Sequence, residues 1–334
     1  MRDAEPRWRM LNTDAGEFAA PHDLERRARD LGIEIVALEG HDPDDIAAAG
    51  VECDGLFLYR ATVDDELLER LPRCRVLARC GTGYERIDVE AAARRGVMVT
   101  YVPDFCTEEM SETVLLFVLA FARRLPRLMW AARERRWLSI SEIVPTPRRL
   151  TGRTLAILGF GRTGQRTAEK ASALGLDVRV WTRTPRPEAL ERSGAREASF
   201  EEALACDYVA LHLPLTDATT GLIGREELAR FRPDGVLINV ARGPIVDTDA
   251  LVDALREGRL GGAALDVVEP SPLPPGHPLW ELSNVLVTSH SASLSVEALR
   301  EALSTAIEDA AAFLGGRLPR FPIPELRDTV AARL

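Results

Sequence analysis

Short apolar runs rich in β-branched residues alternate with helix-length stretches along almost the whole chain. This alternation is typical of parallel sheets covered by helices, because successive parallel strands need a crossover between them. The 334 residues are more than one ordinary α/β core contains, so two domains are expected. The runs of the first series, which predict a flavodoxin-like domain, lie at 8–11, 33–38, 55–59, 75–79 and 97–102.

The second series predicts a Rossmann-type, doubly wound parallel sheet. A helix is expected at about 107–124 before this series, and another at about 294–314 would return the chain to the first domain. The stretch 321–326 would then complete that first domain. The runs of the second series lie at 154–160, 177–181, 208–213, 235–240, 263–267 and 284–289.

These two series define the expected domain boundaries. Residues 1–104 and 298–334 would form the flavodoxin-like domain that binds substrate and carries out catalysis. Residues 105–297 would form the Rossmann domain that binds a dinucleotide. The fold class is therefore α/β, with two parallel-sheet domains.

Composition excludes several classes of partner. The net charge of −10 argues against binding to nucleic acid or to an anionic membrane, because a phosphate-binding surface needs clustered positive charge. The five cysteines are scattered without CxxC spacing, which predicts reduced thiols and neither disulfides nor a metal site. The start MRDAEPRWRM lacks the apolar core of a signal peptide, and no run of apolar residues is long enough to cross a membrane. A cytoplasmic enzyme or binding protein is expected.

Basic residues are distributed unevenly. The stretch 123–137 carries arginines at helical spacing, which predicts a solvated helix face or a contact with a second subunit. Lys170 is the sole lysine of the chain. Its position inside a predicted helix argues against Schiff-base chemistry.

The stretch GFGRTG at 159–164 follows a predicted strand and opens a predicted helix. In that context it indicates a dinucleotide-binding turn. Gly159 permits the tight turn, Gly161 lets the backbone approach the pyrophosphate, and Gly164 allows the helix to pack on the sheet. The pyrophosphate would lie at the helix N-terminus, where free N–H groups favour an anion.

The end of the second strand of this domain bears on the choice of cofactor. A strand that selects NAD usually ends with a carboxylate for the ribose hydroxyls, but Thr182 stands there, eighteen residues after Gly164, and Arg183 follows. A hydroxyl and a guanidinium suit a 2′-phosphate, because they do not repel it and the guanidinium donates two charged hydrogen bonds. The sequence therefore predicts a preference for NADP(H). In the alternative, Arg183 is a solvated loop residue and NAD(H) is used.

Several motifs in fixed order resemble those of the D-isomer-specific 2-hydroxyacid dehydrogenases, and the resemblance covers essentially the full chain. Within that family, the stretch 102–112 is most similar to the branch that includes the C-terminal-binding-protein corepressors. The motifs are CGTGYERID (80–88), VPDFCTEEMSE (102–112), GFGRTG (159–164), LHLPLT (211–216), LINVARGPIVD (237–247), AALDV (263–267) and NVLVTSH (284–290).

The resemblance implies roles for several residues. Arg242 matches the family's arginine, which clamps the carboxylate and ketone oxygens of a 2-keto acid, and its fork geometry suits a carboxylate. His290 matches the acid–base histidine, which can donate a proton in reduction and accept one in oxidation. The backbone N–H groups of Thr82 and Gly83 match the loop that holds the substrate carboxylate. Asp104 is expected to disfavour a second acidic group on the substrate.

Further positions are expected on the cofactor side of the site. Asp266 matches a residue near the nicotinamide, Asn239 matches another cofactor-side position, and Pro214 would line the adenine pocket. The remaining predicted cofactor contacts are Arg162, Thr163, Thr184, Leu213, Val240 and Ala241.

The sequence departs from the family's pattern beside the catalytic histidine. The usual partner of that histidine is a glutamate five residues after the aspartate, and Ser271 stands in its place. Because a nearby carboxylate stabilises the imidazolium, its loss should leave His290 protonated less often at neutral pH. In one interpretation Ser271 orients the imidazole through a hydrogen bond. In a second, Glu269 takes over the role, and in a third the site has drifted towards an unusual substrate or towards binding alone.

Two functions remain open at this stage. The first is an oxidoreductase that reduces a 2-keto acid to the D-2-hydroxy acid with NADP(H), or with NAD(H), and the second is a non-catalytic dinucleotide-binding sensor or corepressor-like protein. Retention of both Arg242 and His290 favours the enzyme, whereas loss of the glutamate favours the binder. The resemblance also implies a homodimer formed through the nucleotide-binding domain.

Overall fold

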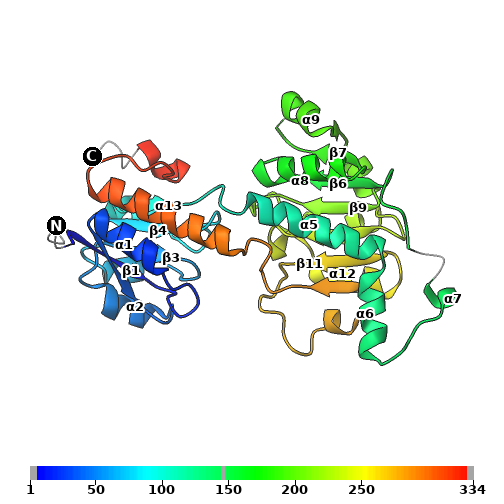
Figure 1. Cartoon of the computed structure of the whole chain (residues 1–334), viewed down its shortest axis with the longest axis horizontal. Helices are drawn as coiled ribbons and strands as arrows, with labels where there is room; N and C mark the ends of the chain where they lie inside the picture. The colour runs from blue at the N-terminus through cyan, green and yellow to red at the C-terminus, as the bar shows by residue number, and fades with distance from the viewer. Residues whose placement is uncertain (1–5, 144–146, 185, 329–334) are drawn as a thin grey trace. The chain divides into compact units, whose positions relative to one another are not determined.

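The computed structural model describes residues 6–143, 147–184 and 186–328. The chain divides into two compact units, Met1–Phe105 with Ser295–Leu334 and Cys106–Leu294 (Figure 1). The chain passes into the second unit after Phe105, one residue later than the boundary expected at 104/105. It returns to the first unit after Leu294, three residues earlier than the boundary expected at 297/298. Each unit is built around its own parallel sheet, so the expected α/β class is confirmed.

The first unit contains a five-stranded parallel sheet with the order β2-β1-β3-β4-β5. This is the flavodoxin-like order, in which the chain reverses direction across the sheet after its second strand. The strands are β1 (Trp8–Asn12), β2 (Ile33–Ala37), β3 (Gly55–Leu58), β4 (Val76–Arg79) and β5 (Met98–Thr100). The helices are α1 (His22–Asp30), α2 (Pro43–Gly50), α3 (Asp65–Glu69), α4 (Val89–Arg95) and α13 (Val296–Leu314).

The C-terminal segment completes this first unit, as expected from the sequence. The buried carboxylate of Asp309 in α13 accepts hydrogen bonds from the backbone N–H groups of Arg320 (2.8 Å) and Phe321 (2.9 Å). Ile323 then donates its backbone N–H to the carbonyl of Val99 (3.0 Å). The stretch around the short helix η3 (Pro324–Leu326) is therefore held against edge strand β5.

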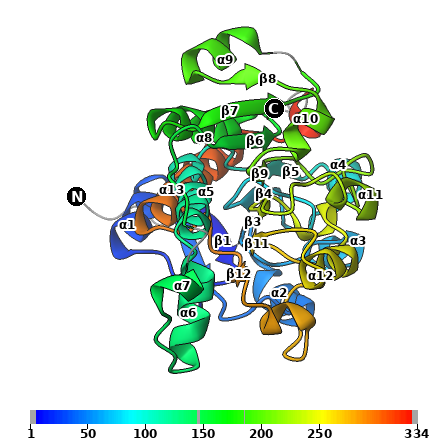
Figure 2. The same ribbon diagram turned by 90° about the vertical axis from the view of Figure 1, so that its right-hand side faces the viewer.

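The second unit contains a seven-stranded parallel sheet with the order β12-β11-β10-β9-β6-β7-β8. Six of its strands were expected, and β8 (Arg196–Glu197) was missed because both of its residues are exposed and charged and carry no apolar pattern. Figure 2 shows β8 beyond β7 at one edge of the sheet. The other strands are β6 (Thr154–Leu158), β7 (Asp177–Trp181), β9 (Tyr208–Leu211), β10 (Val236–Asn239), β11 (Gly262–Leu265) and β12 (Val285–Val287).

When the strands of the second unit are numbered from β6, their order is the Rossmann order with one further strand, β12, at the edge. The order reverses between the neighbouring strands β6 and β9. The connection from β6 leads to β7 on one side of this pair, and the connection from β9 leads to β10 on the other side. Ligands of such sheets bind outside the carboxyl ends of the strands at this switch point. The helices are α5 (Thr107–Ala122), α6 (Leu125–Arg133), α7 (Ile140–Ile143), α8 (Arg162–Ala173), α9 (Pro187–Ser193), α10 (Phe200–Leu204), α11 (Arg225–Leu228) and α12 (Thr248–Arg256), with short helices η1 (Gly243–Ile245) and η2 (Pro278–Glu281).

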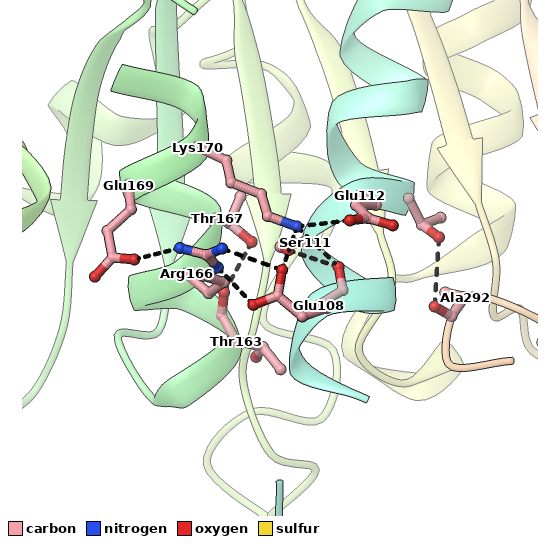
Figure 3. Close-up of polar contacts among 10 residues, drawn as sticks. Glu108, Ser111, Glu112, Thr163, Arg166, Thr167, Glu169, Lys170 and Ala292 are labelled. Atoms are coloured by element: carbon pink, nitrogen blue, oxygen red, sulfur yellow. Dashed lines mark hydrogen bonds and ion pairs between the residues drawn. The ribbon is translucent and has the colours of Figure 1, made fainter. Parts of the chain in front are cut away.

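A network of ion pairs joins α5 to α8 (Figure 3). The carboxylate of Glu108 lies 2.7 Å from Nε of Arg166 and 2.7 Å from Nζ of Lys170, and Glu112 lies 2.9 Å from the same Nζ. Burial acts to lower the pKa of Lys170, but the two glutamates outweigh burial and raise it. Lys170 is therefore a charged structural residue at neutral pH, as its position in the sequence suggested.

Three further observations concern the described part of the chain. Among the described residues no helix is both long and apolar enough to span a membrane, and no three metal-binding side chains of the His, Cys, Asp and Glu types gather at one point. All five cysteines lie in the described part of the chain, are buried and form no disulfide, and burial raises the pKa of Cys74 and of Cys80 to about 12. These two thiols therefore remain protonated at neutral pH.

Candidate active site

The glycine turn after β6 has the geometry predicted for a dinucleotide site. Gly159 has φ +97°, and a Cβ atom there would lie 2.4 Å from the carbonyl oxygen of His212. A Cβ atom on Gly164 would lie 2.4 Å from the carbonyl oxygen of Gly159, whereas one on Gly161 would meet nothing within 4 Å. Gly159 and Gly164 are therefore required by the fold, and Gly161 leaves open space where a ligand could approach the backbone.

The first turn of α8 offers backbone donors beside this turn. The first intrahelical bond runs from the N–H of Gln165 to the carbonyl of Gly161 (2.9 Å), so the preceding N–H groups have no acceptor within the helix. Gly161 is the N-cap and provides no side-chain cap. Together with the helix dipole, these donors fit the pyrophosphate of a dinucleotide. Arg162 and Thr163 lie in this turn, as predicted.

The end of β7 carries the residues predicted to select the cofactor. The hydroxyl of Thr182 lies 3.3 Å from both the N–H and the carbonyl of Thr184, and these contacts shape the loop. Arg183 is exposed and has no hydrogen bond or ion pair to any other described residue. Arg186, to which no role was assigned from the sequence, is likewise exposed, and its side chain has no hydrogen bond or ion pair to any other described residue. Within these described residues, two unpaired guanidinium groups therefore follow this strand.

Leu213 and Pro214 follow β9 at the switch point. Leu213 is half-buried against the core, and the carbonyl of Pro214 accepts a hydrogen bond from the hydroxyl of Thr219 (2.7 Å). Val240 and Ala241 follow β10, and both side chains are buried. A cofactor could therefore contact Val240 and Ala241 mainly through their backbone.

Asn239 shapes the loop that carries Arg242. Its side-chain oxygen accepts a hydrogen bond from the N–H of Ala241 (3.0 Å), and its side-chain nitrogen donates to the carbonyl of Arg242 (2.9 Å). Nη1 of Arg242 also donates to the carbonyl of Ala241 (2.8 Å). The amide of Asn239 is thus occupied by the backbone on both sides of Arg242, and it positions this arginine at the carboxyl end of the strand.

Asp266 holds the loop that carries His290. One carboxylate oxygen accepts from the hydroxyl of Thr288 (2.6 Å) and the N–H of Ser291 (2.8 Å), and the other accepts from the N–H of Ala292 (2.9 Å). The N–H of His290 donates to the backbone carbonyl of Asp266 (2.9 Å). The contacts of its buried carboxylate connect Asp266 to the histidine loop, and its position on the cofactor side of the site stays a prediction.

This anchoring matters because His290 adopts a left-handed backbone conformation, with φ 53°. A residue other than glycine reaches this region at a cost of order 1–3 kcal/mol, which the surrounding contacts must offset. The loop is also attached to α5, where the hydroxyl of Thr113 donates to the carbonyl of Ala292 (3.3 Å). The imidazole of His290 is exposed at the end of this loop.

Ser271 and Glu269, the two residues considered as partners of the histidine, are both exposed. Ser271 has no hydrogen bond to any other described residue, so the bond to His290 that one of the three interpretations invoked is not formed in this structure. The loop itself is held by backbone contacts. The hydroxyl of Thr248 donates to the carbonyl of Glu269 (2.7 Å), and a Cβ atom on Gly243 would lie 2.2 Å from the carbonyl oxygen of Val268.

The predicted substrate loop of the first unit follows β4. The hydroxyl of exposed Thr82 donates to the carbonyl of Val102 (3.1 Å), while Arg79 donates through Nε to the carbonyl of Gly83 (2.7 Å) and through Nη1 to the carbonyl of Leu58 (3.1 Å). Arg79 therefore supports the loop that contains both predicted carboxylate donors. Asp104 is half-buried in the same unit, just before the crossover to α5.

Sequence reasoning missed two residues near these loops. Arg79 stands directly before CGTGYERID, and an arginine inside an apolar strand was a signal of buried carbonyl partners. His212 stands in LHLPLT, where only the two following residues were assigned. Desolvation lowers the pKa of His212 to about 4, with no charged group contributing among the described residues, although the residue retains some exposure.

Taken together, the fold and these loops define an α/β protein with a dinucleotide turn and with an arginine and a histidine at strand ends of the same unit. The model of the family "D-isomer specific 2-hydroxyacid dehydrogenase, NAD binding domain" matches residues 115–292, slightly more than half of the chain. The chain belongs to the D-isomer specific 2-hydroxyacid dehydrogenases and is an oxidoreductase of that family. The resemblance stated from the motifs is thereby confirmed.

Individual relatives agree with this assignment. The chain is 39% identical over 274 residues to a glyoxylate reductase of Aeropyrum pernix, and the match covers 80% of this chain and 82% of the relative. A crystal structure of a protein from Thermus thermophilus has a TM-score of 0.86 at 36% identity and covers 94% of this chain and 99% of that one. The NADPH-dependent glyoxylate/hydroxypyruvate reductase of Sinorhizobium meliloti, solved with NADP and malonate, has a TM-score of 0.81 at 30% identity and covers 96% and 98%. None of these three is described as a corepressor, so the predicted branch within the family stays a prediction.

The substitution Asp266→Asn tests the anchoring of the histidine loop. The amide retains one acceptor for Thr288 and Ser291, but its NH₂ group would face the N–H of Ala292, so one charge-assisted bond is replaced by two opposed donors. We expect a loss of about 1–3 kcal/mol in the free energy of unfolding and at least a roughly tenfold fall in kcat, because such a loss allows the His290 loop to relax.

The matched control for this substitution is Asp247→Asn. Asp247 caps α12 by accepting a hydrogen bond from the N–H of Ala250 (3.0 Å), and asparagine caps a helix about as well as aspartate. Urea denaturation and steady-state kinetics should therefore change little in the control. If Asp266→Asn behaved like the control in both measurements, the proposed anchoring role would be wrong.

Proposed function

We propose that this protein reduces a 2-keto acid to the corresponding D-2-hydroxy acid with a reduced nicotinamide dinucleotide, preferentially NADPH. The observation that carries the proposal is that Asn239 and Asp266 hold the loops of Arg242 and His290 at strand ends of the unit that contains the dinucleotide turn. A protein that only binds a dinucleotide needs neither residue. The relatives that are named as reductases support the same conclusion.

Arg242, His290 and the backbone of Thr82 and Gly83 would each have a separate role in this reaction. The guanidinium of Arg242 would bind the carboxylate and polarise the ketone oxygen, because its planar fork matches two oxygens. When bound, the nicotinamide would supply the hydride to C2. The imidazolium of His290 would donate a proton to the oxygen that becomes the alkoxide, so that one hydride and one proton convert the ketone to an alcohol. We assign the remaining carboxylate contacts to the N–H groups of Thr82 and Gly83.

The first prediction from this proposal is NADPH oxidation with a small 2-keto acid. Glyoxylate, hydroxypyruvate, pyruvate and bulkier 2-keto acids should be compared by the fall in absorbance of the reduced cofactor. We expect turnover with at least one of the small acids, and a fall of kcat/KM by roughly a thousandfold in Arg242→Lys, which keeps the charge but loses the fork. Tight dinucleotide binding without turnover of any acid would instead favour the non-catalytic sensor.

The preference for NADP(H) rests on the end of β7. Thr182 replaces the carboxylate that would repel a 2′-phosphate, and the exposed guanidinium groups of Arg183 and Arg186 are unpaired in the described part of the chain. A phosphate binds such groups through charge-assisted hydrogen bonds. The Sinorhizobium meliloti relative, whose description is NADPH-dependent, agrees with this choice.

The substitution Arg183→Ala tests the cofactor preference. Loss of charge-assisted bonds worth about 1.5–3 kcal/mol should raise the Kd of NADPH roughly tenfold to a hundredfold and leave the Kd of NADH within about twofold. Calorimetric titration measures both constants. Arg192→Ala is the control, because Arg192 lies at the far end of α9 and its exposed side chain has no ion pair to any described residue. A wild-type protein that binds NADH more tightly than NADPH would contradict the proposal.

The loop of Ser271 gives the third prediction of this proposal. A glutamate at this position would bring a carboxylate towards His290 and favour its protonated form, which is the form that reduction requires. Ser271→Glu should therefore shift the high-pH limb of the kcat profile for reduction upwards by about one pH unit and raise the rate at neutral pH. Glu269→Gln tests the alternative partner, and it should leave the profile unchanged. An unchanged profile in Ser271→Glu would refute the assignment of this loop.

We also propose that the protein is a homodimer formed through α5, α6 and α7. These helices and the segment before α7 present a set of exposed apolar side chains, and Trp137 in that segment is 98% exposed. A soluble protein rarely leaves such a set uncovered, and a second copy of the chain supplies the same apolar surface. The residues are Leu116, Leu119, Leu125, Met129, Trp137 and Ile140. The helix α6 covers the middle of the arginine-rich stretch 123–137, for which a contact with a second subunit was considered from the sequence.

Light scattering tests this proposal directly. The wild-type protein should have twice the chain mass of 36.7 kDa, and Trp137→Glu combined with Ile140→Glu should give the monomer, because burying two charges at an interface is costly. Val51→Glu is the control, since Val51 is an exposed apolar residue of the other unit. A dimer that survives the double substitution would place the interface elsewhere.

A further inference from the structure

His212 lies where the order of strands reverses. It follows β9 directly, its N–H donates to the carbonyl of Leu158 (2.8 Å), and its own carbonyl oxygen occupies the place that a Cβ atom on Gly159 would need. The backbone of His212 is therefore packed against the glycine turn itself. No role was assigned to its side chain from the sequence or from the family's motifs.

The imidazole of His212 lies between two threonines of α8. Its Nδ1 is 3.3 Å from Oγ1 of Thr163, and its Nε2 is 3.3 Å from Oγ1 of Thr167. Thr167 is buried and lies one helical turn after Thr163, and both are labelled in Figure 3. A single ring thus bridges the first and second turns of the helix whose N-terminus faces the predicted pyrophosphate site.

Which atom donates in each of these hydrogen bonds follows from which of the atoms carry a hydrogen. The hydroxyl hydrogen of Thr167 is used by its 2.8 Å bond to the carbonyl of Thr163. Towards the ring, Thr167 can therefore only accept, so Nε2 must carry a hydrogen. The desolvation that lowers the pKa of His212 to about 4 keeps the ring neutral above that pH, so Nδ1 carries none. Nδ1 must then accept the hydroxyl hydrogen of Thr163.

These bonds form a closed ring that begins and ends on Thr163. Its hydroxyl donates to Nδ1, Nε2–H donates to Thr167, and the hydroxyl of Thr167 donates back to the carbonyl of Thr163. The hydroxyl hydrogen of Thr163 is consequently committed to the protein. What remains on this residue for an anionic ligand is its backbone N–H, which has no acceptor within the helix.

We propose that His212 is a positioning residue for the dinucleotide: its Nε2–H tautomer orients Thr163 and fixes the first turn of α8 against the glycine turn, so that backbone donors face the pyrophosphate. This inference rests on the proposed dinucleotide binding. Because the pyrophosphate is common to both cofactors, the ring supports NADH and NADPH equally. It differs in this respect from Arg183, which distinguishes the two.

Two substitutions of His212 separate the roles of its nitrogens. Asparagine can place an oxygen near the position of Nδ1 and keep the acceptor for Thr163, whereas glutamine can place an NH₂ group near the position of Nε2 and keep the donor to Thr167. In calorimetric titrations with NADH, NADPH and ADP-ribose, we expect His212→Asn to bind each within about threefold of the wild type. His212→Gln should bind all three roughly tenfold more weakly, which is the effect of one lost hydrogen bond.

Thr163 provides the second pair of variants, in case His212 cannot be replaced without loss of folding. Thr163→Val keeps the shape and removes the hydroxyl, and Thr163→Ser restores it. The valine variant should weaken all three ligands about tenfold, and the serine variant should restore wild-type affinity. Equal losses of affinity and of melting temperature in His212→Asn and His212→Gln, or an unchanged affinity in Thr163→Val, would overturn the proposal and leave His212 as a packing residue.

A readout that does not depend on ligands distinguishes failure of this inference from failure of the proposed function. The ¹⁵N chemical shifts of the imidazole, assigned by their disappearance in His212→Asn, should show a neutral ring with its hydrogen on Nε2 from pH 8 down to about pH 5. A hydrogen on Nδ1, or a charged ring at pH 6, would refute the inference even if the enzyme were active. If the expected tautomer were found but the wild-type protein bound no dinucleotide, the proposed function would fail, and with it the positioning role.

Discussion

The close approach of β9 to the glycine turn after β6 is the constraint on which the second unit depends. With the carbonyl of His212 against Gly159, no side chain fits at Gly159, and the turn must adopt a positive φ. The same packing brings Gly164 against the carbonyl of Gly159 and thereby sets where α8 begins. The free N–H groups of α8 and the space beside Gly161 follow from this arrangement, because the order of strands leaves the switch point uncovered.

The loops that carry Arg242 and His290 depend on polar side chains whose hydrogen bonds are made mainly to the backbone. Asn239 makes two such bonds around Arg242, and the carboxylate of Asp266 accepts bonds from three residues around His290. Because a buried polar group is costly unless it is satisfied, these bonds are maintained and the loops stay in place. The guanidinium of Arg242 and the imidazole of His290, to which we assign the chemistry, are consequently carried by loops that hydrogen bonds within the protein hold in place. The left-handed conformation of His290 is sustained in the same way.

The loop that carries Ser271, where the sequence departs from the family's pattern, is held by residues other than Ser271. Ser271 is exposed and forms no hydrogen bond within the described chain, and the carboxylate of Glu269 is exposed as well. The loop keeps its place through the carbonyl of Glu269 and the close packing of Gly243 on Val268. These contacts do not involve the side chain of Ser271, so the loop is held without it. Under the proposed function, the absence of a carboxylate at this position acts on the protonation of His290, because protonation depends on nearby charge.

The sequence by itself determined the order of strands and helices, the two domains, the glycine turn and the positions of Arg242 and His290. These features depend on local periodicity and on spacing along the chain, which are visible without a structure. The short strand β8 escaped prediction because its two exposed charged residues have no pattern, and pairing with β7 makes them a strand. Only the tertiary structure decided that Asp266 anchors the histidine loop, that Arg79 supports the predicted substrate loop and that His212 joins two threonines. The physical reason is that the contacts of Asp266 and His212 connect groups 22 to 49 residues apart, and such pairs are chosen by packing of the whole sheet.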